Sequence, residues 1–181
     1  RRMILPALWL TLSHRQAPIE IREGLVVSGV AGGGRTPIIR DSIGAKLVRG
    51  EPLSPRAGDT GATPGGKTAW WKGITANADG VFQGNGYIYV TVDSDEDKPM
   101  ILEAAGDTLV YVNGSLRAGD PYGTKYLRLP FQLKKGINEF LFSVGRGELT
   151  ARLLTPSAPQ QIDTGDLTLP DVLSSDKGNL F

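Results

Sequence analysis

The chain has 181 residues, enough for one domain with a hydrophobic core of its own. Its 24 glycines and 12 prolines suit many short strands joined by turns, and its formal net charge of +1 gives no global bias toward nucleic acid or anionic membranes. It contains no cysteine, which excludes a disulfide scaffold, a thiolate nucleophile and any zinc site built with cysteine.

The N-terminal stretch, residues 1–23, has two interpretations. Arg1 and Arg2 precede a short apolar run, as at the start of a signal peptide. Pro6 interrupts the run and no small-residue cleavage site follows, so we favour an arm or a first β-strand packed on the domain. The run is too short to span a membrane.

The next part of the chain predicts short strands and one long loop. Residues 24–31 are rich in valine and end at three glycines, which favours a strand. Residues 36–40 and 45–48 are short strand candidates. Residues 50–67 are dense in glycine and proline with few apolar residues, which predicts a long surface loop.

Period-two alternation dominates the second half of the chain. Apolar residues alternate along 86–93 and again along 140–144, and a short apolar run covers 100–104. Between them, 109–112 is apolar on both faces and is followed by Asn113-Gly114, the strongest short-range signal for a hairpin with a type I′ turn.

A last strand is predicted over 148–154, and no segment has a helical period. About nine or ten strands at this spacing predict an all-β fold, an antiparallel two-sheet sandwich over residues 24–155. Residues 156–181 lose the pattern and are predicted to be an extended linker or arm toward a following domain.

One nucleotide-binding motif occurs, at residues 61–68, which match G-x-x-x-x-G-K-T and end in Lys67 and Thr68. A phosphate-binding loop must leave a buried strand and open a helix. The residues before it do not form a strand pattern and those after it are β-prone, so nucleotide binding is the weaker alternative.

The sequence gives no sign of catalysis by this chain. His14 is the only histidine, and no G-x-S-x-G motif is present. A pair of carboxylates for glycoside hydrolysis stays open, because aspartate and glutamate are plentiful but nothing singles out two of them. We therefore predict that the chain itself is not an enzyme.

Metal binding has one candidate, the acidic loop that holds Asp93, Asp95 and Asp97. Calcium prefers several carboxylate and carbonyl oxygens, but the loop lacks the spacing and the glycine of an EF-hand. We favour a solvated hairpin loop, with a structural calcium as the alternative, and predict no other cofactor.

Ligand binding has five candidate residues: Trp70, Trp71, Arg117, Asp120 and Tyr122. The adjacent tryptophans point to opposite faces of a strand, so that one can lie in the core while the other is partly exposed. An exposed aromatic ring can stack on a sugar, and arginine or aspartate can bind its hydroxyls. The alternative is structural, with both tryptophans packed and Asp120 pinning a turn.

The run 110–114, followed by Leu129, Phe131, Gly136 and Asn138, resembles the galactose-binding-like jelly roll. It is similar in particular to the sugar-binding module of family 2 glycoside hydrolases and to accessory modules of secreted esterases and peptidases. The resemblance covers residues 70–154 well and 24–48 loosely.

The resemblance implies a jelly-roll sandwich that serves as a non-catalytic accessory module of a secreted or periplasmic multidomain hydrolase. Its partner would be carbohydrate or the adjacent catalytic domain of the same chain, with no nucleic acid or membrane partner. Members of this family bind carbohydrate through loops, carry a structural calcium, or only brace the catalytic domain. No ligand residue of the family matches here, so none is carried over.

Overall fold

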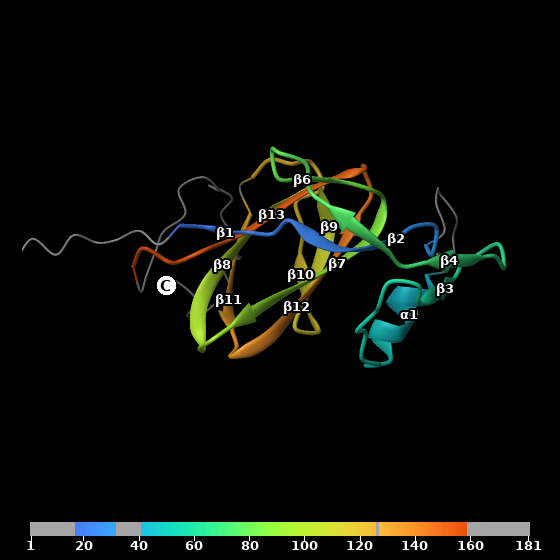
Figure 1. The fold of residues 1–181 in the computed structure, drawn as a ribbon, viewed down its shortest axis with the longest axis horizontal. Coiled ribbons are helices and arrows are strands. Elements are labelled where there is room, and N and C mark those ends of the chain that lie inside the picture. Colours follow the sequence, from blue (N-terminus) through green and yellow to red (C-terminus); the bar gives the residue numbers. More distant parts are fainter. Residues whose placement is uncertain (1–16, 32–40, 126, 159–181) are drawn as a thin grey trace, which may run out of the picture.

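The computed structural model describes residues 17–31, 41–125 and 127–158, which form 13 β-strands and one α-helix (Figure 1). Every pairing between these strands is antiparallel. Two of the sheets stack face to face, so the predicted all-β antiparallel sandwich is confirmed, with more strands than the nine or ten expected.

Sheet A has five strands in the order β1-β13-β8-β11, with β6 also paired to β13. Its strands are β1 Ile19–Glu20, β6 Val81–Gln83, β8 Lys98–Ala105, β11 Arg128–Leu133 and β13 Glu148–Leu154. Sheet B has six strands in the order β10-β9-β12-β7-β2-β5. Its strands are β2 Glu23–Val27, β5 Lys72–Thr75, β7 Gly86–Ser94, β9 Asp107–Val112, β10 Ser115–Ala118 and β12 Gly136–Val144. From β7 onward the chain alternates between the two sheets, except at the β9–β10 hairpin, whose two strands both belong to sheet B.

The alternation along β12 shows how the sequence builds two hydrophobic cores. Phe140 and Phe142 are fully buried between the sheets, where they pack with residues of β8 and β13 in the main core. Leu141 points to the opposite face of sheet B and is buried there as well, in a second core. Burial on both faces is the pattern expected of a central strand.

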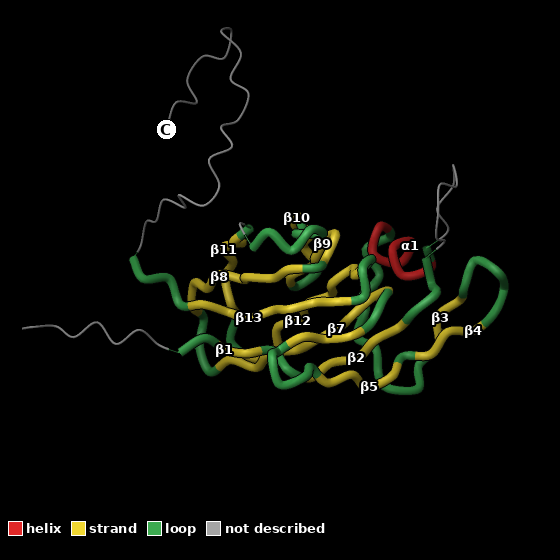
Figure 2. The backbone as a smooth tube through the Cα atoms, turned by 90° about the horizontal axis from the view of Figure 1, so that it is seen from above, coloured by secondary structure: helices red, strands yellow, loops and turns green. Residues whose placement is uncertain are grey.

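The second core lies under a short cover made of helix α1 (Ser42–Val48) and the hairpin of β3 (Thr60–Ala62) and β4 (Thr68–Trp70). Figures 1 and 2 both show these elements together at one end of the molecule, beyond sheet B. Ile43 of α1 and Trp71, which follows β4, pack there against Tyr87 and Tyr89 of β7. The molecule therefore has three layers: sheet A, sheet B and the cover.

The predicted Asn113-Gly114 turn is confirmed, and side-chain hydrogen bonds connect it to a second turn, between β11 and β12. Asn113 and Gly114 both have positive φ, 48° and 80°, as a type I′ turn between β9 and β10 requires. At the other turn, Asn138 is completely buried, and its side-chain amide donates to the carbonyls of Lys134 (2.7 Å) and Gly136 (3.0 Å). Asn138 also accepts from the Asn113 side chain at 3.0 Å, which ties the two turns together.

The prediction of a strand at 45–48 is wrong, because these residues belong to α1. Asp41 caps the helix: its side chain accepts hydrogen bonds from the backbone N–H groups of Ile43 and Gly44, both at 2.9 Å. Ile43 and Leu47, four residues apart, lie on one helical face and pack on the second core. A window of four apolar-rich residues is too short to separate this spacing from that of a strand.

The long loop predicted over 50–67 is partly wrong, because β3 forms inside it and pairs with β4. The strand predicted at 24–31 is shorter, since β2 ends at Val27 and Gly29 takes a positive φ of 76°. The strand candidate at 36–40 lies outside the described residues. At the N-terminus, β1 pairs with β13, and residues 1–16 and 159–181 also lie outside the described part of the chain.

Candidate functional site

Two adjoining pockets lie along sheet A, on the face away from the cover. The first has a volume of about 170 Å³ and is bounded by Glu20, Asp79 and Arg152. The second is bounded by Tyr122 and Arg146. Both are lined by Ala105, Lys125 and Thr150, so the two pockets adjoin, and we call them together the sheet A groove.

A ladder of charges crosses three neighbouring strands at the first pocket. Glu103 of β8 stands opposite Arg152 of β13 on one side and Arg128 of β11 on the other. Its carboxylate accepts a hydrogen bond from Nε of Arg152 at 2.7 Å and lies 3.4 Å from Nε of Arg128. The ladder holds Arg152 in place beside the groove.

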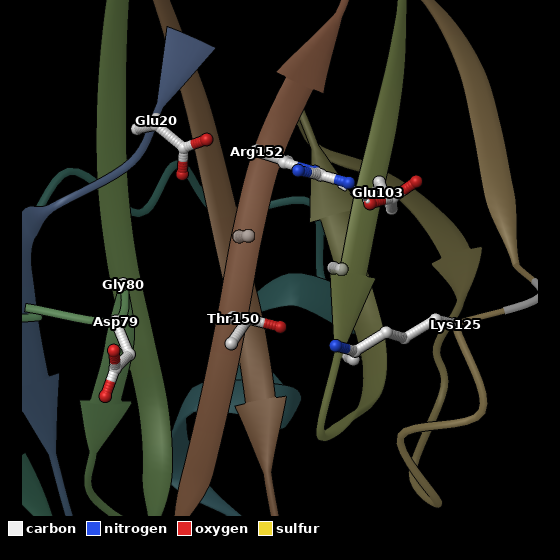
Figure 3. A pocket seen from close by; sticks show the side chains of 10 residues that line it. Glu20, Asp79, Gly80, Glu103, Lys125, Thr150 and Arg152 are labelled. Atoms are coloured by element: carbon white, nitrogen blue, oxygen red, sulfur yellow. Dashed lines mark hydrogen bonds and ion pairs between the residues drawn. The ribbon is translucent and has the colours of Figure 1, made fainter. Parts of the chain in front are cut away.

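The other charged residues of the first pocket are not paired in this way. Glu20, Asp79 and Lys125 form no salt bridge within the described part of the chain. In Figure 3, Lys125 extends from one side toward Thr150, while Glu20 and Asp79 stand on the other side of β13. The pocket therefore offers both hydrogen-bond donors and carboxylate acceptors to a ligand.

Asp120 fixes the position of Lys125. Its carboxylate, in a residue only 5% exposed, accepts from the backbone N–H groups of Thr124 (3.0 Å) and Lys125 (2.6 Å). Lys125 adopts a positive φ of 60°, an uncommon conformation that these hydrogen bonds stabilise. Burial opposes ionisation of Asp120, but the hydrogen bonds from Lys125 and Thr124 outweigh it and lower its pKa.

Tyr122 supplies an aromatic ring at the other end of the groove. The residue is 74% exposed, and the guanidinium of Arg146 lies over its ring, 4.6 Å from the centroid. A cation at this distance is attracted to the face of the ring and holds its orientation. An oriented, exposed ring beside polar groups is suited to stacking against a sugar.

The five predicted ligand residues do not form one site. Asp120 and Tyr122 belong to the loop beside the groove, whereas Arg117 lies on β10 and donates to the carbonyl of Pro130 at 3.1 Å. Trp70 and Trp71 belong to the cover: Trp71 is 2% exposed and makes an edge contact with Tyr89, while Trp70 is 53% exposed. The two adjacent tryptophans thus differ in burial, Trp71 lying in the second core and Trp70 partly exposed.

Several charged groove residues were missed from the sequence, among them Glu20, Asp79, Glu103, Lys125, Arg146 and Arg152. They come from separate strands and turns, and each is an ordinary surface charge in its own segment. Only the strand register brings Glu103 and Arg152 together. No local signal marks them.

The acidic loop makes hydrogen bonds at the β7–β8 turn. Asp93 accepts from the backbone N–H of Ser94 at 3.0 Å, and Asp97 accepts from that of Lys135 at 2.6 Å. Over residues 17–31, 41–125 and 127–158, no group of three or more histidine, aspartate or glutamate side chains is placed to hold a metal ion. Asp93, Asp95 and Asp97 therefore do not form such a group in the described part of the chain.

The nucleotide-binding motif at 61–68 lies in the β3–β4 hairpin. Thr63 and Lys67 form two hydrogen bonds across the hairpin. The backbone N–H of Lys67 donates to Oγ1 of Thr63 at 3.0 Å, and the backbone N–H of Thr63 donates to the carbonyl of Lys67 at 2.9 Å. Lys67 is followed by β4, so this segment lacks the helix N-terminus that a phosphate-binding loop requires.

Comparison with known proteins yields no relative: no family model, no curated protein and no solved structure matches this chain. The single helix of the described residues, α1, is not long and apolar enough to cross a bilayer. The case for a function therefore rests on the geometry of the groove.

Proposed function

We propose that this chain is a non-catalytic carbohydrate-binding module that binds a saccharide along the sheet A groove. The supporting observation is the exposed ring of Tyr122, oriented by Arg146, at one end of a groove that holds Lys125, Glu20 and Asp79. A sugar presents an apolar C–H face to an aromatic ring, and its hydroxyls both donate and accept hydrogen bonds.

The mixture of charges favours a neutral polyhydroxylated ligand over an ion. Carboxylates and an ammonium group lie in the same pocket, and Glu103 is already paired with two arginines. The resemblance to galactose-binding-like jelly rolls supports the same function. On the basis of this resemblance, we also propose that the module works beside a secreted or periplasmic hydrolase domain.

The test is affinity electrophoresis of the full chain in gels that contain a panel of plant, bacterial and animal polysaccharides. Retention by at least one polysaccharide is expected, and Tyr122→Ala should weaken binding by about tenfold, because one stacking contact is worth about 0.5–1.5 kcal/mol beyond its buried area. Trp70→Ala is the matched control, since it removes an exposed aromatic residue away from the groove. Absence of retention across the panel, or equal loss with both variants, would contradict the proposal.

A second candidate function, bracing a neighbouring domain, is favoured by the outer surface of the cover. Val48 of α1 is 86% exposed and Trp70 of β4 is 53% exposed, although both are large and apolar. Apolar side chains at the surface can pack against a neighbouring protein unit, and we propose the cover as the contact surface for this bracing role. If bracing is the role, Trp70→Ser should lower the melting temperature of the attached domain while Tyr122→Ala leaves it unchanged.

A further inference from the structure

A separate pocket lies on the opposite side of the sandwich, between sheet B and the segment that leaves α1. Its volume is about 280 Å³, and residues from β7, β9 and β12 form its floor. Tyr89, Tyr111 and Leu141 line it from the sheet, and Leu47 and Leu53 close it from the cover side. We call it the sheet B pocket; it shares no lining residue with the sheet A groove.

The lining of the sheet B pocket carries negative charge only. Glu51 and Glu139 are its charged residues, and no lysine or arginine lines it. Glu51 is paired with Arg49. Glu139 forms no ion pair with any described residue, so it is the uncompensated charge of the pocket.

One oxygen of the Glu139 carboxylate is hydrogen-bonded within the protein, and the other is available to a ligand. Its Oε1 accepts from the hydroxyl of Tyr89 and from Oγ of Ser54, the latter at 2.7 Å. Its Oε2 has no hydrogen-bond partner in the described part of the chain, and it is not among the side-chain atoms sealed from solvent there. Backbone bonds with Asn113 fix the residue further, because the Glu139 N–H donates to Asn113 Oδ1 at 2.9 Å.

Tyr89 is a donor in this arrangement over the whole physiological range. Burial raises the pKa of its hydroxyl, and the neighbouring Glu139 raises it further, so the phenol keeps its proton. Tyr89 and Tyr111 also line the pocket, and an aromatic ring attracts a cation placed over its face, while the leucines add apolar lining.

We propose that the sheet B pocket binds a primary ammonium group carried on an aliphatic chain, such as the side chain of a lysine in a peptide. The ammonium N–H would donate to Oε2 of Glu139, the cation would lie against the tyrosine rings, and the methylene groups would pack on Leu53 and Leu141. This inference is independent of the proposed saccharide site, because it uses other residues on another sheet.

The test is a titration of the ¹⁵N-labelled full chain with Nα-acetyl-lysine methylamide, and with the neutral analogue Nα-acetyl-norleucine methylamide, followed by NMR. Shifts of the Asn113, Gly114 and Glu139 amides are expected with the lysine compound, which should bind at least about tenfold more tightly than the norleucine compound, as a charge-assisted hydrogen bond would give. Glu139→Gln keeps an acceptor for Tyr89 but loses the charge, and should weaken binding of the lysine compound by a similar factor. Glu103→Gln, in the sheet A groove, should leave it unchanged.

Equal affinity for the two compounds, no saturable shift up to about 10 mM ligand, or shifts confined to the sheet A groove would each overturn the inference. Circular dichroism checks that Glu139→Gln folds. If it does not fold, the comparison of the charged and neutral compounds on the unaltered chain decides the question by itself.

Discussion

Asp107 and Asp120 are neighbouring buried residues whose carboxylates have opposite surroundings. The N–H of Asp120 approaches Oδ1 of Asp107 at 3.5 Å. Asp120 accepts several hydrogen bonds, whereas Oδ2 of Asp107 is buried without a partner in the described residues. Burial raises the pKa of Asp107, with a further contribution from the charge of Asp120. The pKa of Asp120 is lowered by its hydrogen bonds, despite its burial.

The opposite pKa shifts predict opposite pH dependences for two matched substitutions. The folded pKa of Asp107 lies above the unfolded value of about 3.9, so its stabilising contribution is complete below that value and is lost as the pH rises through the folded pKa. Asp107→Asn avoids this loss and should be more stable than the unaltered chain at pH 8, by about 1–2 kcal/mol, with the difference shrinking toward pH 4.

Asp120→Asn is the matched opposite. Because the folded pKa of Asp120 is lowered, its contribution is present above the unfolded pKa and is lost as the pH falls. The substitution should therefore be destabilising at pH 8 and less so near pH 3. Urea unfolding at several pH values measures both variants, and a pH-independent difference for Asp107→Asn would contradict the account of its burial.

Among the elements, α1 depends on a single residue at its start. Besides capping two backbone N–H groups, Asp41 accepts the hydroxyl of Tyr87 through Oδ2 at 2.6 Å, which joins the helix to sheet B. Asp41→Ala removes all three bonds and should destabilise the fold by about 1–2 kcal/mol, the range for loss of a helix cap. Asp41→Asn keeps a side-chain oxygen that can cap the helix, so it should destabilise the fold less. Denaturant unfolding followed by tryptophan fluorescence measures both, and an unchanged midpoint for Asp41→Ala would show that the cap is dispensable.

The elements also show why some of the structure could be predicted and some could not. The strand around Phe140 alternates over enough residues to fix both its type and its facing, and the Asn113-Gly114 turn follows from local backbone preferences. The strand β3 has only the residues Thr60-Gly61-Ala62, without a hydrophobic signal, and forms because β4 pairs with it. The sheet A groove depends on register between distant strands, which no local pattern encodes.

At the scale of the whole molecule, the cover and the sandwich have different sources of stability. Helix α1 has 7 residues and the β3–β4 sheet has two strands, and elements of this size are marginal in isolation. The cover is therefore held mainly by Ile43 and Trp71 packed on the tyrosines of β7. The sandwich has a larger core of its own between two multi-stranded sheets.

This difference predicts that the cover opens without unfolding the sandwich. In native-state hydrogen exchange, the amides of Arg49 and Trp71, which bond to Ala45 and Asp59, should exchange with a lower opening free energy than those of Phe140 and Leu141 in β12. Trp71→Ala leaves a cavity in the second core and should lower the opening free energy of the cover by about 3–5 kcal/mol, up to its full value.

The matched control is Phe142→Ala, which creates a cavity in the main core and should lower the opening free energy of β12 as well. Equal opening free energies for all four amides in the unaltered chain would show that the three layers unfold as one cooperative unit. Because the sheet B pocket is closed partly by Leu47 and Leu53, opening of the cover would also release an ammonium ligand bound there. A saturating lysine compound should therefore raise the opening free energy of the cover amides, and that of the sandwich amides by the same amount, because unfolding of the sandwich also releases the ligand.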